Sequence, residues 1–339
     1  MTLLQKTGVI ILCVILLIHI LRYFIQNAKT QALNHQDFDG DLYQIGESVV
    51  AFQADNGATD TPKRTVVCMH GWLEDQRYFS KVHHNKNDEL ILINSCGYHL
   101  PNTKRSTKAA NWQTPNPYAK YTIEYDAAVL IMAVKNLASH ANLVLHGHSR
   151  GGAVVIEAIK QAPDLFAQAH VILEASILPE ATVSRTHQYP KIIDKVLTNI
   201  ILYVFPFIAF YMSKKTLSAT TIKGMGLVNK ENGFLLSGML ACAKSAIVLQ
   251  HNIENMLVWP LKNKMHILEN VKSGYILLGA RDTVLSRRLM LKTAQKHRGA
   301  LKIINTENSS HFISLDIPGQ VKSLCNDACV HQTRPQVSQ

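Results

Sequence analysis

The sequence predicts an α/β fold, in which a mostly parallel central sheet is covered by helices on both faces. Short apolar runs rich in Val, Ile and Leu alternate along the chain with longer segments of helical periodicity. The runs lack a strict polar–apolar alternation, which is typical of strands buried on both faces. We expect strands at Ser48–Gln53, Thr65–Met69, Glu89–Asn94, Asn142–His146, His170–Glu174, Gly274–Leu278 and Leu301–Asn305.

The segments between these runs predict helices. The clearest one is 121–140, whose apolar residues recur at helical spacing: Ile123, Ala127, Leu130, Val134 and Leu137. Segments 152–161 and 287–296 have the same character. Strands that alternate with helices favour parallel pairing, because each helix carries the chain back to the start of the next strand.

One interval, 177–266, contains no clear strand. It includes the nearly uncharged run "VLTNIILYVFPFIAFYM" at 196–212. We interpret the interval as a helical cap inserted into a core formed by 41–176 and 267–330, followed by a polar tail at 331–339. The apolar run either packs the core of the cap, or forms an acyl pocket or a surface that dips into a membrane.

The amino terminus predicts a transmembrane anchor. From Gly8 to Ile25 the chain reads "GVIILCVILLIHILRYFI", which is long enough to span a bilayer if Arg22 reaches the interface. We expect 1–40 to be a membrane anchor and linker. A cleaved signal peptide is the alternative, and the balanced basic residues on either side leave the orientation open.

Composition limits the classes of function. The 339 residues are 47% apolar and 17% charged, which allows a large core and excludes wholesale disorder. The net charge of +11 comes from scattered Lys and Arg residues, so a basic surface facing anionic lipid or substrate is favoured over a nucleic-acid site. The six cysteines include no CxxC pair and predict free, mostly buried thiols.

The stretch "LVLHGHSRGGAVV" at 143–155 places Ser149 between Gly147 and Gly151, after a strand and before a helix. This is the G-x-S-x-G pattern of a nucleophile elbow. The glycines, with Gly152 after them, allow the helix to approach the strand closely. Ser149 is then expected to project at the carboxyl edge of the sheet, at the positive end of the following helix.

A serine hydroxyl needs a base, and the base needs an orienting acid. The strand "YILLGARD" ends at Asp282, and "KIINTENSSHF" places His311 just past the last strand. Both side chains are expected at the edge that holds Ser149. Glu174, at another strand end, is an alternative acid, although a solvated strand end is the simpler interpretation. We interpret His148 as a packed elbow residue.

Another strand leads into "HGWLED", where Gly71 allows a close turn. The backbone N–H of Trp72 and that of Arg150 are then placed to form an oxyanion hole. His70 is expected to support this turn. We interpret Asp75 as exposed or a helix cap, and the adjacent histidines as surface residues, namely His83 and His84.

Four motifs in order, "HGW", "GHSRGG", "GARD" and "SSHF", resemble those of the α/β-hydrolase family over about 41–330. The resemblance implies an α/β-hydrolase fold. It also implies that Ser149 is the nucleophile, His311 the general base and then acid, and Asp282 the orienting carboxylate. Trp72 and Arg150 would serve through their backbone N–H groups.

The expected function is that of a serine hydrolase that cleaves a carboxylic ester, acyl or lipid-like, through an acyl-enzyme. No metal and no organic cofactor is expected. A thioesterase or acyltransferase with the same triad, or a non-catalytic membrane-anchored binding protein, is the alternative. The expected partners are a small-molecule or lipid ester and a membrane, contacted through residues 8–25 and by the cap, with no nucleic acid and an open oligomeric state.

Overall fold

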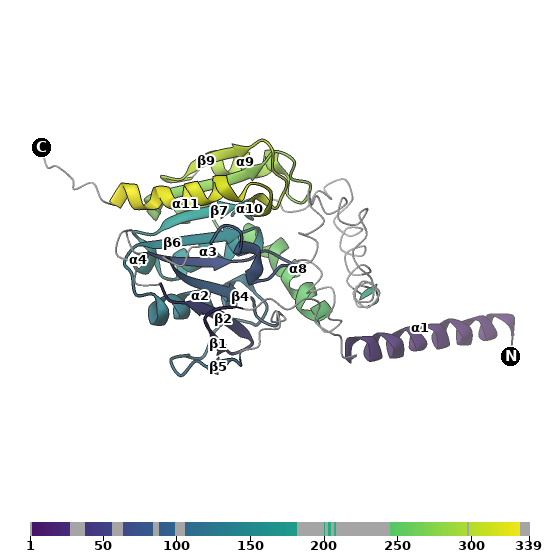
Figure 1. The fold of residues 1–339 in the computed structure, drawn as a ribbon. Helices are drawn as coiled ribbons and strands as arrows, with labels where there is room; N and C mark the ends of the chain where they lie inside the picture. Colours follow the sequence, from purple (N-terminus) through teal and green to yellow (C-terminus); the bar gives the residue numbers. More distant parts are fainter. Residues whose placement is uncertain are drawn as a thin grey trace, which may run out of the picture.

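The computed structural model describes residues 2–27, 38–55, 64–83, 88–98, 106–181, 245–296 and 298–332, together with 200, 203, 204 and 207. Within them one sheet has the strand order β5-β1-β2-β4-β3-β6-β7-β8-β9, and helices lie on both of its faces (Figure 1). The strands are β1 Asp41–Ile45, β2 Ser48–Gln53, β3 Thr65–Met69, β4 Glu89–Asn94, β5 Lys108–Ala109, β6 Leu143–His148, β7 His170–Glu174, β8 Ser273–Gly279 and β9 Lys302–Thr306. The predicted α/β class is confirmed.

The helices connect and cover these strands. The α-helices are α1 Leu3–Asn27, α2 Ile123–Leu137, α3 Arg150–Gln161, α4 Pro163–Phe166, α8 Ser245–Lys262, α9 Arg287–Lys296, α10 Ile313–Asp316 and α11 Pro318–Gln332. Among the described residues the 3-10 helices are η1 Gln76–Phe79 and η3 Met265–Asn270. The central strands pair in parallel, in the order β4-β3-β6-β7-β8-β9, whereas β2 is antiparallel to both β1 and β4.

Each predicted strand is present, with its ends shifted by at most two residues. Strand β6 runs on to His148, so it ends directly at Ser149. The sequence did not predict β1 and β5. Strand β1 is short and half-buried, and it forms a hairpin with β2 through Gly46, while β5 has only two residues.

Two apolar cores lie on opposite faces of the sheet. In β3, Val67 and Met69 join the core that contains α2 and α3. Val66 and Cys68 join the other core, which contains η1, α10 and α11. Both faces of the central strands are therefore covered, which explains their lack of polar alternation.

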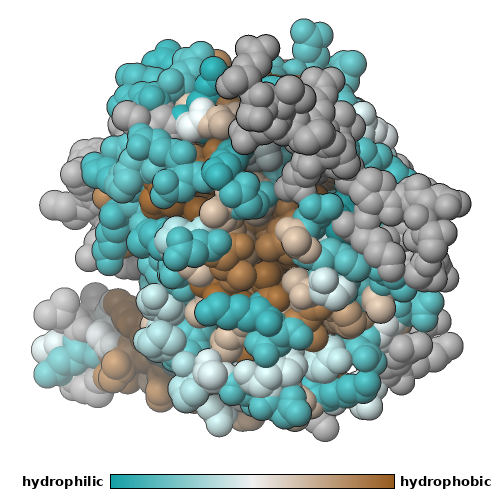
Figure 2. Space-filling model, turned by 90° about the vertical axis from the view of Figure 1, so that its left-hand side faces the viewer, coloured by the Kyte–Doolittle hydropathy of each residue, from teal (hydrophilic) through white to brown (hydrophobic). Residues whose placement is uncertain are grey.

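Figure 2 shows the end of the molecule that carries α4, where apolar residues are visible within a mostly hydrophilic surface.

Helix α1 extends away from the sheet (Figure 1). Its segment Gln5–Phe24 is long and apolar enough to cross a membrane, and none of that span is buried. A signal sequence passes the same test of length and composition. The helix contacts Tyr203: Arg22 Nε donates to the main-chain oxygen at 3.2 Å, and the Tyr203 hydroxyl lies 3.1 Å from His19 Nδ1.

The predicted cap lies largely outside the described residues, as do most of the linker and the tail. The division of the chain into these parts therefore stays a prediction. Within 177–266 the structure describes α8, which packs against the helices of the sheet. Trp259 of α8 is buried, and its Nε1–H donates to Glu157 of α3 at 2.9 Å.

Candidate active site

Ser149 forms the turn between β6 and α3 with a strained backbone. Its φ of 52° and ψ of −116° lie in a region that residues with a side chain rarely adopt. Three main-chain hydrogen bonds hold this conformation. The Ser149 N–H donates to the oxygen of Glu174 at 2.9 Å, and the Ser149 oxygen accepts from the N–H groups of Gly152 and Ile177, each at 3.1 Å. The strand end of β7 thus fixes the turn that exposes the serine hydroxyl.

The elbow glycines are required by close contacts. A Cβ on Gly151 would lie 1.9 Å from the main-chain oxygen of Met69, and a Cβ on Gly147 would lie 2.6 Å from that of Gly151. Real Cβ atoms do not approach backbone oxygens so closely. Glycine at these positions lets α3 start against the ends of β3 and β6.

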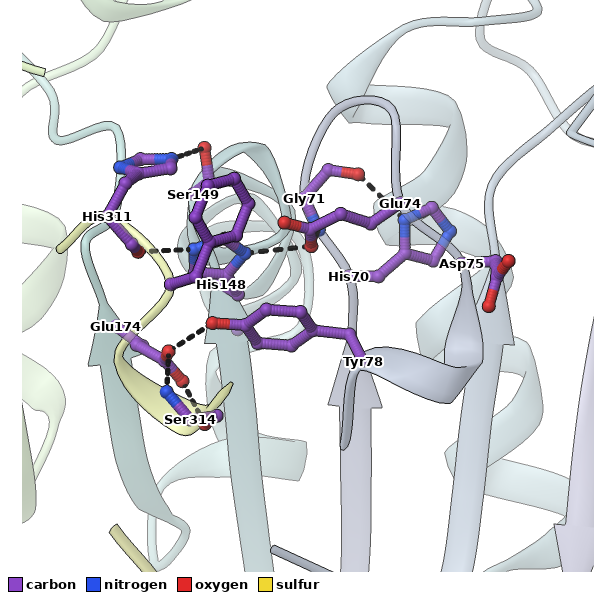
Figure 3. Close-up of polar contacts among 12 residues, drawn as sticks. His70, Gly71, Glu74, Asp75, Tyr78, His148, Ser149, Glu174, His311 and Ser314 are labelled. Atoms are coloured by element: carbon purple, nitrogen blue, oxygen red, sulfur yellow. Dashed lines mark hydrogen bonds and ion pairs between the residues drawn. The ribbon is translucent and has the colours of Figure 1, made fainter. Parts of the chain in front are cut away.

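The structure brings Ser149, His311 and Asp282 together in one hydrogen-bonded chain (Figure 3 shows the first two). The Ser149 Oγ lies 3.0 Å from His311 Nε2, and His311 Nδ1 lies 2.9 Å from Asp282 Oδ2. Because a carboxylate only accepts, Nδ1 carries the proton and Nε2 accepts from the serine hydroxyl. Ser149 and His311 are 6% and 3% exposed, so these contacts are well shielded from water.

Asp282 is held as a carboxylate. Burial raises its pKa, but the hydrogen bond and the electrostatic interaction with His311, together with the N–H groups of Val284 and Leu285, outweigh this, and the pKa is lowered. Its Oδ1 accepts those two N–H groups at 2.7 and 2.9 Å, which leaves Oδ2 for the imidazole. The loop after β8 therefore aims one carboxylate oxygen at His311.

Glu174 is not a solvent-exposed residue at the end of its strand, because its side chain is fully buried. Its oxygens accept from the Tyr78 hydroxyl, from His146 Nε2 at 2.8 Å, and from the N–H and hydroxyl of Ser314 at 2.6 and 2.5 Å. Burial raises its pKa, but these donors and the electrostatic interactions with His148 and His146 lower it to about 2. None of these bonds involves the His311 ring, so Glu174 joins β7 to η1 and α10.

The turn after β3 lies against the nucleophile. A Cβ on Gly71 would lie 3.0 Å from the Cβ of Ser149, and Trp72 follows directly. In the part of the chain that the structure describes, neither the Trp72 N–H nor the Arg150 N–H donates a hydrogen bond. Both N–H groups therefore lack a hydrogen-bond acceptor among these residues. The Trp72 N–H lies on the turn next to Ser149, and the Arg150 N–H belongs to the residue that follows Ser149.

The side chains of His70 and Asp75 stabilise this turn and the short helix that follows it. His70 Nδ1 donates to the Gly71 oxygen at 2.7 Å, and its Nε2 accepts from the Ser95 N–H at 3.1 Å. Burial lowers the His70 pKa, consistent with a neutral ring. Asp75 is buried and caps η1, accepting from the Arg77 N–H at 2.9 Å. Of its two sequence interpretations, the helix cap holds and exposure is wrong.

Sequence reasoning gave Arg150 a backbone role and overlooked its side chain. The guanidinium is fully buried, with Nη1 donating to Asp126 Oδ2 at 2.7 Å and to Ser95 Oγ at 3.2 Å. The pair ties the start of α3 to α2. Asp126 lies in the first turn of α2, and no local pattern marks it as a partner of Arg150.

His83 was also misjudged, because it is buried rather than on the surface; His84 lies outside the described residues. Cys68, His83 and His146 place their ligand atoms within 4.8 Å of one another. His83 Nε2 lies 3.0 Å from His146 Nδ1, and His146 Nε2 lies 2.8 Å from Glu174. Since both nitrogens of His146 are engaged in hydrogen bonds, we assign no metal to this cluster.

Comparison with known proteins yields similarity of structure. Neither a protein-family model nor a curated protein matches the sequence. A thermophilic esterase from Thermogutta terrifontis is 15% identical, with a TM-score of 0.56 over 88% of this chain and 97% of the esterase. An esterase from Exiguobacterium antarcticum is 16% identical, with a TM-score of 0.54 over 84% of this chain and 97% of that one.

A third similar structure is MGS-M2, an α/β-hydrolase enzyme from a Medee basin deep-sea metagenome library. It is 13% identical, with a TM-score of 0.58 over 88% of this chain and 100% of that one. At such identities the similarity concerns the fold, which the family resemblance of the motifs had implied. The strand order, the elbow after β6 and the covered faces of the sheet agree with it, and the chain therefore has the α/β-hydrolase fold.

Proposed function

We propose that this protein is a serine hydrolase that cleaves carboxylic esters. The observation that carries the proposal is the chain of hydrogen bonds from Ser149 Oγ through His311 to Asp282, built on a strained elbow. A positioned base that is itself oriented by a carboxylate is what a serine hydroxyl requires to become a nucleophile.

In the proposed reaction His311 Nε2 takes the proton of Ser149 as its oxygen attacks the ester carbonyl. The Trp72 and Arg150 N–H groups receive the developing oxyanion, each contributing up to about 3–4 kcal/mol. His311 then protonates the leaving alcohol, an acyl-enzyme forms, and a water activated by His311 releases the acid. Asp282 holds the ring and stabilises its imidazolium form.

An acyl or lipid-like ester is the substrate class that we favour. The support is the apolar span at Gln5–Phe24 and the uncharged run at 196–212, which would hold the enzyme at a bilayer. The esterases with similar structures are in line with ester cleavage, although one fold hosts many chemistries.

A fluorophosphonate probe on the full chain in detergent tests the proposal. We expect covalent labelling of the native protein, and none in Ser149→Ala or after heat denaturation, because only an oriented His311 activates the hydroxyl. An ester series of increasing chain length then measures kcat/KM, and long chains should be preferred. A folded wild type that neither labels nor hydrolyses any ester would contradict the proposal and favour a non-catalytic binding protein.

A further inference from the structure

Both ring nitrogens of His148, the residue before the nucleophile, face acceptors. Nδ1 lies 2.8 Å from Glu74 Oε2, and Nε2 lies 2.9 Å from the main-chain oxygen of His311 (Figure 3). A carbonyl oxygen only accepts, so Nε2 carries a proton. Glu74 Oε2 also accepts from the Gly71 N–H at 2.8 Å, and as a carboxylate oxygen it accepts from Nδ1 as well, so that Nδ1 carries a proton too. A ring that donates from both nitrogens is an imidazolium.

The surroundings of the ring stabilise a buried cation. The His148 side chain is fully buried. Tyr78 of η1 stacks on it, with ring centroids 4.2 Å apart and an interplanar angle of 12°, an arrangement that favours a cation over a π face. The titratable ring of His311 faces it from the segment after β9, with centroids 4.9 Å apart. Burial lowers the pKa of His148, but the carboxylates of Glu74 and, from β7, Glu174, with the His311 carbonyl, raise it to about 9.

The ring also joins the backbone segments that the proposed reaction uses. Through Glu74 it reaches Gly71, the residue before the oxyanion donor Trp72. Through Nε2 it holds the main chain of His311, and its own backbone leads directly into Ser149. A small change at this ring would move the nucleophile, the base and the oxyanion hole relative to one another.

We propose that His148 is a positioning residue that, as an imidazolium paired with Glu74, sets the spacing of the oxyanion turn, Ser149 and His311. The inference rests on the proposed serine hydrolysis, and His148 acts through these groups without touching the substrate. A neutral ring has one N–H and keeps one of the two contacts. Activity should therefore fall as pH rises through the range in which the ring loses its proton.

The test compares wild type with His148→Gln, Glu74→Gln and the double variant, all as full chains in detergent. We measure kcat and KM for a p-nitrophenyl ester, and the rate of fluorophosphonate labelling, from pH 6 to 10. Glutamine can donate to Glu74 or to the His311 carbonyl but not to both. Each single variant should lower kcat about 10²-fold, the cost of a displacement of about 1 Å, with KM changed less than about threefold.

The pH profile and the double variant separate positioning from general stability. Wild-type kcat should decline as pH rises through about 9. The kcat of Glu74→Gln should decline at lower pH than that of wild type, because its His148 ring has lost the paired carboxylate. The pH profile of His148→Gln should lack this decline at high pH. Because the two residues act as a unit, the double variant should be no slower than the slower single variant.

His140→Gln is the matched control. His140 pairs with Asp55 at 2.8 Å near the start of β6, at the opposite end of that strand from Ser149, and its variant should keep wild-type kcat. Wild-type kcat that stays level to pH 10, or a folded His148→Gln within threefold of wild type, overturns the inference. Should His148→Gln not fold, the shifted limb of Glu74→Gln decides. Absence of labelling in wild type at every pH refutes the proposed function instead.

Discussion

At the scale of single residues, environment separates two carboxylates that lie at neighbouring strand ends. Glu174 is fully buried and Asp282 is partly buried, and both acids have lowered pKa values. One carboxylate oxygen of Asp282 accepts from backbone N–H groups, and the other accepts from His311 Nδ1. The oxygens of Glu174 are engaged by Tyr78, His146 and Ser314. Because of these partners, Asp282 is suited to orient His311, whereas Glu174 is suited to stabilise the fold.

Asp282→Asn should therefore remove activity and keep the fold. An amide that donates to Nδ1 would stabilise the wrong tautomer of His311, and we expect kcat to fall about 10⁴-fold with little change in Tm. Glu174→Gln should instead lower the free energy of unfolding by about 3 kcal/mol or more, because it disrupts a buried charged network. Ester hydrolysis and urea unfolding measure the two effects. The opposite pattern would make Glu174 the catalytic acid.

At the scale of elements, the site depends on how closely α3 starts against the sheet. Gly151 lies against the main chain of Met69 at the end of β3. The buried Arg150–Asp126 pair fixes the same end of α3 to α2. The first turn of α3 therefore cannot shift without moving Ser149, and the nucleophile is positioned by packing between elements as well as by its own strained backbone.

Gly151→Ala tests this close contact. The added Cβ would lie 1.9 Å from a backbone oxygen, so α3 must move, and we expect a loss of about 2–3 kcal/mol in the free energy of unfolding with slower fluorophosphonate labelling. Gly319→Ala is the control, because nothing lies within 4 Å of its added Cβ. Its stability should change by less than about 1 kcal/mol. Equal stabilities for the two variants would argue against the packing requirement.

At the scale of the whole molecule, an exposed apolar helix is attached to a globular core. The described side chains of α1 between Val9 and Phe24 are largely exposed. Exposure of so long an apolar surface to water is unfavourable, and the length of the helical span matches the thickness of a bilayer. The contacts of Arg22 and His19 with Tyr203 connect this helix to the interval predicted as the cap.

We expect the protein to stay with membranes after an alkaline carbonate wash and to keep the mass of its full chain. Leu12→Arg with Leu16→Arg should release it, because each charge in the centre of a spanning helix costs about 2.5–3.5 kcal/mol. Arginine replacements at exposed Lys108 and Lys135 control for added guanidinium groups. A soluble chain that lacks the first ~27 residues would identify a cleaved signal peptide.

The main features of the fold could be predicted because they depend on local sequence patterns. Strands buried on both faces require continuous apolar runs, and β2, β3, β4 and β7 begin and end at the predicted residues. Strand β1 escaped prediction because it is short and half-buried. Ser149 could be found because a nucleophile elbow requires glycine at fixed offsets. Asp282 could be found because it follows a buried strand, and His311 because it follows the last strand of the sheet.

The rest of the site depends on residues that are distant in the chain. Glu74 meets His148 across 74 positions, and His148 meets the His311 carbonyl across 163. No spacing or periodicity marks such pairs, because the sheet brings them together after its strands have paired. The same holds for His83, which looked like a surface residue and is covered by the packed core.

By itself the sequence determined the α/β class, the order of most elements, the apolar amino-terminal helix and the positions of Ser149, Asp282 and His311. These follow from local hydrophobicity and backbone sterics, which neighbouring residues decide. Only the tertiary structure decided which carboxylate faces His311, that Glu74 and His148 form a buried ion pair, and that Arg150 joins Asp126. Those contacts form only where the folded chain excludes water and brings distant segments within hydrogen-bonding distance.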